Sequence, residues 1–76
     1  METIIVDFNN LDNCGQVRLN TTGALKSIHE NSIELIEGKR VQLDDTEGLK
    51  NIGPLHFSKD ENIWVVKISA ENFIEY

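Results

Sequence analysis

The sequence predicts a mainly β fold: a small, curled antiparallel sheet or barrel of five to six short strands, with one or two short helical turns. First, apolar and polar residues alternate with a period of two through much of Ile33–Ser69, as in strands with one buried face. Second, glycine, proline, asparagine and aspartate separate these runs at short intervals. Third, a flat sheet in so short a chain would leave long edges open to pairing, so we expect it to curl on itself.

The chain is predicted to form a single domain, residues 1–76, because no linker, repeat or low-complexity tract divides it. A domain of this length buries only about 60% of the surface that its unfolded chain exposes, so its core is small. An enclosed active site needs walls that such a thin domain rarely supplies. Size alone therefore disfavours an enzyme with a sequestered pocket.

Two strands are predicted in the first part of the chain. Thr3–Phe8 is rich in β-branched residues, and after a polar loop at 9–15 the short stretch Gln16–Leu19 also alternates. The side chains that we expect to point into the core from these strands are Ile4, Val6, Phe8, Val17 and Leu19.

The next segment favours two turns of helix from about Gly23 to Glu30. Gly23 disfavours a helix, however, so the sequence leaves both helix and loop open here. The residues that support the helix are three with side chains able to cap its start and three apolar ones at helical spacing: Asn20, Thr21, Thr22, Ala24, Leu25 and Ile28.

Three main strands are predicted in the second half. The first follows the turn at Glu37–Lys39, the second begins at Gly53-Pro54, and the third is Ile63–Ile68. A connection of about ten residues, rich in acidic side chains and glycine, joins the first two. The apolar residues that alternate along the first two strands are Val41, Leu43, Leu55 and Phe57, with His56 facing outward.

A short helical turn is predicted after the last of these strands. Ser69 can cap a turn through Ala70–Asn72 with its hydroxyl group. Phe73 and Ile74 follow, and we expect their side chains to cover an open end of the barrel.

The strand pattern of the second half resembles that of a small SH3-like barrel. The stretches that carry this resemblance are Ile36–Leu43, Gly53–Phe57 and Ile63–Ile68. The resemblance implies an architecture and no named function, because many unrelated proteins share this kind of barrel. Function must therefore be argued from a site.

Charge limits the classes of partner. Thirteen acidic residues against seven basic ones give a net charge of −6. Nucleic-acid binding is disfavoured, because its affinity comes mainly from clustered Lys and Arg, and here only Lys39 and Arg40 are adjacent. The acidity fits either simple solubility or a basic partner surface.

Cys14 is the only cysteine, so the chain cannot form an intramolecular disulfide, and a reducing compartment is expected. The longest apolar run, Ile63–Val66, falls far short of the roughly 20 residues that span a bilayer. No signal segment or lipidation motif is apparent. We therefore expect a cytoplasmic protein with no membrane partner.

No motif for catalysis, a cofactor or a metal occurs. His29 and His56 lack the spacing to each other and to Cys14 that zinc sites show. Asp12, the charged residue nearest to Cys14 in sequence, disfavours a nucleophilic thiolate because it is negative. The acidic run 44–48 lacks the alternating ligands of a calcium loop. We expect no catalytic residue, no cofactor and a non-enzymatic function.

Ile63, Trp64 and Val65 are the apolar candidates for a binding surface, because this stretch is apolar on both strand faces. One face must pack on the core, whereas the other is either covered by the closing turn or exposed as an interaction patch. Trp64 itself belongs either to the core or to a peptide-binding groove, although a proline-binding groove would need more clustered aromatic residues. The acidic candidates for protein binding are Asp44, Asp45 and Glu47.

We expect another protein as the partner. The leading hypothesis is a protein-interaction module, an accessory subunit or regulatory adaptor, that works through a barrel face or an edge strand. The alternative is an acidic inhibitor or immunity-type protein that neutralises a basic nuclease or nucleic-acid-binding surface. A third class, an enzyme or small-ligand binder, needs a cleft that brings Cys14 or a histidine together with carboxylates. A homodimer is a separate prediction, because open sheet edges favour self-association.

Overall fold

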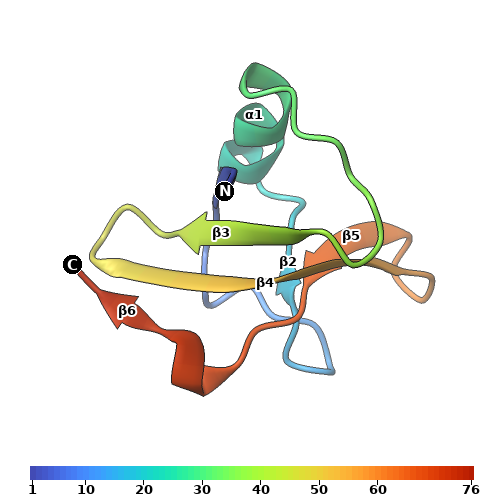
Figure 1. Cartoon of the computed structure of the whole chain (residues 1–76). Helices are drawn as coiled ribbons and strands as arrows, with labels where there is room; N and C mark the ends of the chain where they lie inside the picture. Colours follow the sequence, from blue (N-terminus) through green and yellow to red (C-terminus); the bar gives the residue numbers. More distant parts are fainter.

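A long, curved strand, β4 (Leu49–Ser58), organises the fold, which we describe from a computed structural model of residues 1–76 (Figure 1). Its first half pairs with β3 (Arg40–Asp44) and its second half with β5 (Ile63–Val66), both antiparallel. The two halves meet at Gly53, where a Cβ atom would lie 2.0 Å from the carbonyl oxygen of Lys67. Only glycine lets the chain after β5 cross β4 at this distance.

The sheet has the order β1-β3-β4-β5-β2 and curls into a half-barrel. Its outer strands are β1 (Thr3–Ile5) and β2 (Val17–Arg18), and β6 (Ile74–Glu75) pairs with the start of β4. The predicted mainly β fold with a curled sheet of five to six short strands is confirmed, and it is compatible with a small SH3-like fold.

The pairing of β1 differs from the expected antiparallel arrangement. β1 lies parallel to β3, with Ile4 opposite Leu43, so the sheet is mixed. Parallel neighbours need a crossover of a dozen or more residues. The chain from 6 to 39, which includes β2 and a helix, supplies this crossover.

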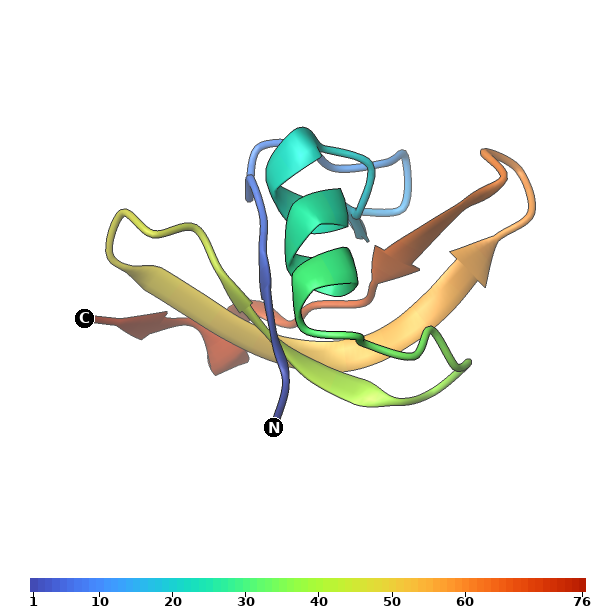
Figure 2. The ribbon, with the colours of Figure 1, turned by 90° about the horizontal axis from the view of Figure 1, so that it is seen from above.

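The ambiguous segment is a helix, α1 (Thr22–Glu30), and it begins one residue earlier than predicted. The Thr21 hydroxyl caps it by accepting a hydrogen bond from the Ala24 N–H at 3.1 Å. α1 lies beside β1 (Figure 2), and its Ser27 hydroxyl accepts a hydrogen bond from the Ile5 N–H at 3.0 Å. This contact satisfies a backbone donor on the outer edge of β1.

No helix in the chain has the length and apolar character needed to cross a bilayer.

The core is one cluster of ten buried residues with larger side chains packed at its margin. Four of the five residues expected to face inward from the first two strands are buried, and the fifth, Phe8, packs half-buried against the cluster. The ten buried residues are Ile4, Val6, Val17, Leu19, Ala24, Ile33, Val41, Leu43, Leu55 and Val66.

The predicted closing turn is a short 3-10 helix, η1 (Ala70–Asn72), and the Ser69 hydroxyl accepts a hydrogen bond from the Glu71 N–H at 3.3 Å. Phe73 then packs edge to face on Phe8, with ring centroids 5.1 Å apart. Ile74 stays 55% exposed. Phe73 thus covers part of the core margin as expected, whereas Ile74 does not.

Candidate functional site

The apolar candidates on β5 divide between the two faces of the strand. Trp64 lies opposite Phe57, with ring centroids 5.4 Å apart, and packs half-buried against the core. Val65 faces the other way and is 0% exposed. The prediction that Val65 contacts a partner is therefore wrong. Ile63 and Trp64 keep part of their surface, and their role in binding stays a prediction.

The burial of Val65 has a cause in the register of the sheet. Arg18 and His56 are its direct neighbours on the two flanking strands, so their long side chains lie on the same face. The Arg18 guanidinium is held there by two hydrogen bonds to Glu61, at 2.7 and 2.8 Å. A patch that is apolar in the sequence is thus covered by polar side chains from neighbouring strands.

The acidic candidates lie at the hairpin between β3 and β4, and two of the three stabilise its turn by accepting backbone hydrogen bonds. The Asp45 carboxylate accepts hydrogen bonds from the N–H groups of Glu47 and Leu49, at 2.8 and 3.0 Å. The Asp44 carboxylate accepts one from the Thr46 N–H at 2.7 Å. The Glu47 side chain is exposed and makes no hydrogen bond.

Asp44 has a second partner far along the chain, because the Tyr76 hydroxyl donates a hydrogen bond to its carboxylate. This bond lowers the pKa of Asp44, and the Thr46 N–H and nearby Lys50 act in the same direction. The same bond raises the pKa of Tyr76. The Lys50 ammonium lies 4.7 Å from the centre of the Tyr76 ring.

A hollow of about 440 Å³ lies between the exit of β1 and this hairpin, and we call it the acidic hollow. It brings Asp7 together with Asp45 and Glu47, and none of these three carboxylates forms an ion pair. The residues that line it are Val6, Asp7, Phe8, Asn9, Asp45, Glu47 and Leu49. Three apolar side chains and three carboxylates that form no ion pair thus line one concave surface.

Asp7 and Leu49, which also line this hollow, were not among the candidates identified from the sequence. Asp7 meets the hairpin because β1 pairs in parallel with β3. The Val6 N–H donates to the Asp44 carbonyl oxygen at 3.0 Å, which places residues 7–9 beside the hairpin. A local pattern identifies Thr3–Ile5 as a strand but does not say which strand it joins.

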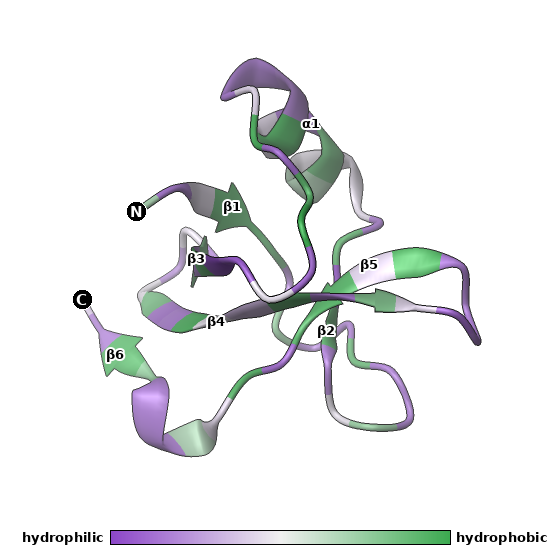
Figure 3. Ribbon diagram, turned by 45° about the vertical axis from the view of Figure 1, so that its right-hand side comes forward, coloured by the Kyte–Doolittle hydropathy of each residue, from purple (hydrophilic) through white to green (hydrophobic).

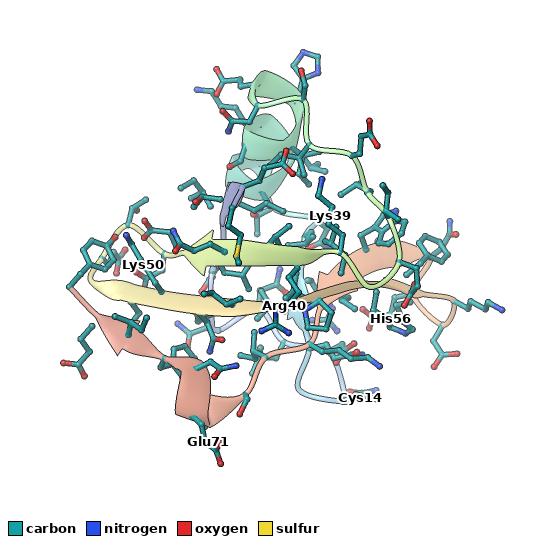
Figure 4. All side chains as sticks on the ribbon, in the orientation of Figure 1. Cys14, Lys39, Arg40, Lys50, His56 and Glu71 are labelled. Carbon is teal, nitrogen blue, oxygen red and sulfur yellow. The ribbon has the colours of Figure 1, made fainter.

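A second hollow, of about 330 Å³, lies near the other end of the sheet and is lined by both Cys14 and His56 (Figure 4). His56 Nδ1 is 2.7 Å from a Glu37 carboxylate oxygen, and this bond lowers the pKa of Glu37. Asp12, also in the lining, accepts hydrogen bonds at 2.9 Å from the backbone N–H of Cys14 and the side chain of Gln16.

The structure thus meets in part the condition set for an enzyme or small-ligand binder, since a thiol and a histidine face one hollow. Two of the three carboxylates that line it have local partners, Asp12 in its own loop and Glu61 in the ion pair with Arg18, whereas Asp60 has none. Glu37, which binds His56, lies outside the lining. No group of three or more His, Cys, Asp or Glu side chains is placed to hold a metal ion. A non-enzymatic function stays a prediction.

Comparison with protein-family models, curated proteins and solved structures finds no match to the chain. The geometry of the molecule therefore carries the functional argument.

Proposed function

We propose that this protein is a non-enzymatic protein-interaction module, an accessory subunit or regulatory adaptor, and that it binds its partner at the acidic hollow. The observation that supports this proposal is the meeting of Asp7, Asp45 and Glu47 with the apolar side chains of Phe8 and Leu49 in one concavity. A lysine or arginine side chain fits this chemistry, because its aliphatic stem can pack on these apolar side chains while its charged end meets the carboxylates. The partner is thus a protein with a basic segment.

The charge of the whole chain favours the same partner. At −6, the protein attracts a basic surface over distances comparable to the Debye length and so speeds encounter. The three ion pairs of the structure use Glu2, Glu37 and Glu61, and all of them lie outside the hollow. The carboxylates of the hollow have no cationic partner, although Asp45 accepts hydrogen bonds from two backbone N–H groups of the turn and Asp7 accepts one from the Asn9 N–H.

The acidic inhibitor or immunity-type protein is the second candidate function, and the same hollow supports it. An inhibitor of a basic nuclease would rely on long-range steering, so its association rate would fall steeply with salt. Asp44 contributes less than expected to such a surface, because Tyr76 and Thr46 already bind its carboxylate. Asp7, Asp45 and Glu47 would be the residues in contact.

We also propose a reducing, cytoplasmic location and keep the homodimer as a prediction. The exposed free thiol of Cys14 supports the location.

The edge of β1 is covered by Ser27 of α1, which leaves β6 as the edge strand of that half of the sheet, where a homodimer could form. Light scattering over a dilution series would test self-association, and a monomer at every concentration would contradict it.

Affinity capture from an extract of the native cells tests the proposed function. The bait is the full chain, compared with an Asp7→Asn, Glu47→Gln variant of the hollow and with a control, Glu30→Gln, Glu34→Gln, that removes the same charge elsewhere. A partner recovered by the wild type and the control, and lost from the hollow variant, supports the proposal. A partner retained by the hollow variant, or no specific partner, contradicts it. Recovery of a basic nuclease or toxin would favour the inhibitor.

A further inference from the structure

The end of the segment Ser69–Tyr76, strand β6, lies along the edge of β4 after the 3-10 turn of η1 (Figures 1 and 3). Its backbone forms a short antiparallel ladder, in which Ile74 is opposite Lys50 and Glu75 is opposite Leu49. The Tyr76 N–H then donates to the Gly48 carbonyl oxygen at 2.8 Å. Backbone pairing on one side of a strand is how proteins bind extended segments by strand addition.

Two side chains of this segment lie at the acidic hollow or beside it. Phe73 packs on Phe8, which lines the hollow, whereas the Tyr76 hydroxyl donates to Asp44, which lies outside the lining and precedes the lining residue Asp45. An aromatic side chain just before β6 and a hydrogen-bond donor just after it thus mark two positions that an occupant of this edge can fill.

The ladder that attaches these residues is short and open to solvent. The β6 ladder has only two residues, and every residue from Ser69 to Tyr76 is exposed. Short, exposed elements with little apolar burial open at a low free-energy cost. Residues 70–76 can therefore leave the β4 edge while the rest of the fold stays intact.

The start of the segment is held more firmly than its end. The side-chain amide of Asn51, which is 0% exposed, donates to the Ser69 carbonyl oxygen at 3.1 Å. Just before it, the Lys67 N–H donates to the Pro54 carbonyl oxygen at 3.2 Å. Ser69 is thus the point about which the segment can swing.

We propose that Ser69–Tyr76 is an internal substitute for the partner, and that the partner binds as an extended strand that replaces it on β4. In this arrangement an aromatic side chain of the partner takes the place of Phe73 on Phe8, and a basic side chain three residues later takes the place of Tyr76. The charge of the site favours this exchange, because Tyr76 offers Asp44 an uncharged hydroxyl, Asp45 and Glu47 form no ion pair, and Lys50 is the one cation beside them. The inference rests on the proposed function and specifies the form of its partner.

Fluorescence anisotropy with labelled peptides tests the exchange. The probes are a peptide with the sequence of Ser69–Tyr76, the same peptide with lysine in the place of Tyr76, and a scrambled peptide. The proteins are the full-length wild type, a Phe73→Ala, Tyr76→Ala variant with a loosened segment, and an Ile36→Ala control that truncates an exposed apolar residue elsewhere. Trp64 fluorescence and circular dichroism confirm that each variant is folded.

We expect the loosened variant to bind the native-sequence peptide about tenfold more tightly than the wild type, because the internal competitor is weakened. The lysine peptide should bind more tightly still at low salt, and the Ile36→Ala control should match the wild type. Equal affinity of the wild type and the loosened variant, or equal binding of the scrambled peptide, overturns the inference.

Dimerisation of the loosened variant without peptide also overturns it, because the occupant of the edge would then be a second copy of the chain. Failure here is distinct from failure of the proposed function. The capture experiment depends on Asp7 and Glu47, which neither peptide nor loosened variant changes.

Discussion

The hydroxyl of Tyr76 donates a hydrogen bond to the carboxylate of Asp44, a residue 32 positions earlier in the chain. This contact joins the last strand to the hairpin that carries the acidic candidates. Asp44 lies outside the acidic hollow and binds Tyr76, whereas Asp45, which also accepts backbone hydrogen bonds of the turn, lines the hollow with Glu47 and Asp7. The division of roles among neighbouring carboxylates is the basis for the function that we propose.

Removal of the Tyr76 hydroxyl should raise the pKa of Asp44. In the folded protein this pKa lies below its ordinary value, chiefly because of the bond from Tyr76, so Tyr76→Phe should return it toward that value. The contribution of the bond to stability is present above the unfolded-state pKa of Asp44, near 4, and is lost as pH falls through the lower folded-state pKa. An NMR titration of the Asp44 carboxyl group measures the change. An identical titration curve in the variant would show that the bond does not form in solution.

Substitution of Gly53 should be costly for a reason of space. A Cβ at this position would overlap the Lys67 carbonyl oxygen, so we expect Gly53→Ala to destabilise the fold by about 3 kcal/mol as the crossing chain shifts. Gly38→Ala is the matched control, because Gly38 has a φ of +84° but nothing within 4 Å of its added Cβ, and its cost should be about 1–2 kcal/mol. Urea unfolding compares the two. A smaller cost at Gly53 than at Gly38 would contradict the close crossing.

Removal of the Ser27 hydroxyl should leave a backbone donor of β1 without a partner. Ser27 is 6% exposed and accepts from the Ile5 N–H, so Ser27→Ala should cost about 1–3 kcal/mol of stability. The exchange of the Ile5 amide hydrogen should also speed up relative to that of Leu43, a buried residue of the paired strand β3. Unchanged exchange at Ile5 would mean that α1 does not protect this edge.

The fold was largely predictable because its signals are local. Alternation identified the strands around Val41, Leu55 and Val65, and the Thr21 hydroxyl, a short-range cap, supports the helix. The predicted connection of about ten residues before Gly53 was wrong, because β4 already begins at Leu49 and only residues 45–48 link it to β3. The partner of β1 was not predictable, since its pairing with β3 joins residues about 39 positions apart through a crossover.

The candidate site was less predictable than the fold. Asp45 and Glu47 were identified from a run of acidic residues, but Asp7 reaches them only through the parallel pairing of β1. The surface expected at Val65 does not exist, because Arg18 and His56 flank it on the neighbouring strands. Alternation within one strand says which residues share a face, not what covers that face.

Truncation of Val65 should therefore behave as a core substitution. We expect Val65→Ala to destabilise the protein by about 2–3 kcal/mol, because the residue is fully buried. Ile63→Ala, on the same face but half-buried, should cost less than about 1 kcal/mol. Equilibrium unfolding in urea measures both values. Equally small losses of stability in both variants would contradict the burial of Val65.

The binding of a basic segment at the acidic hollow is tested most directly by an NMR titration. Full-length ¹⁵N-labelled protein is titrated with a lysine-rich peptide unrelated in sequence to Ser69–Tyr76, so that the result does not depend on exchange at the β4 edge, and every backbone amide is followed. We expect the shifts to concentrate in residues 6–9, 45–50 and 73–76, and to weaken with added salt. Shifts centred instead on Cys14 and His56, or no shifts at all, would contradict the proposed site.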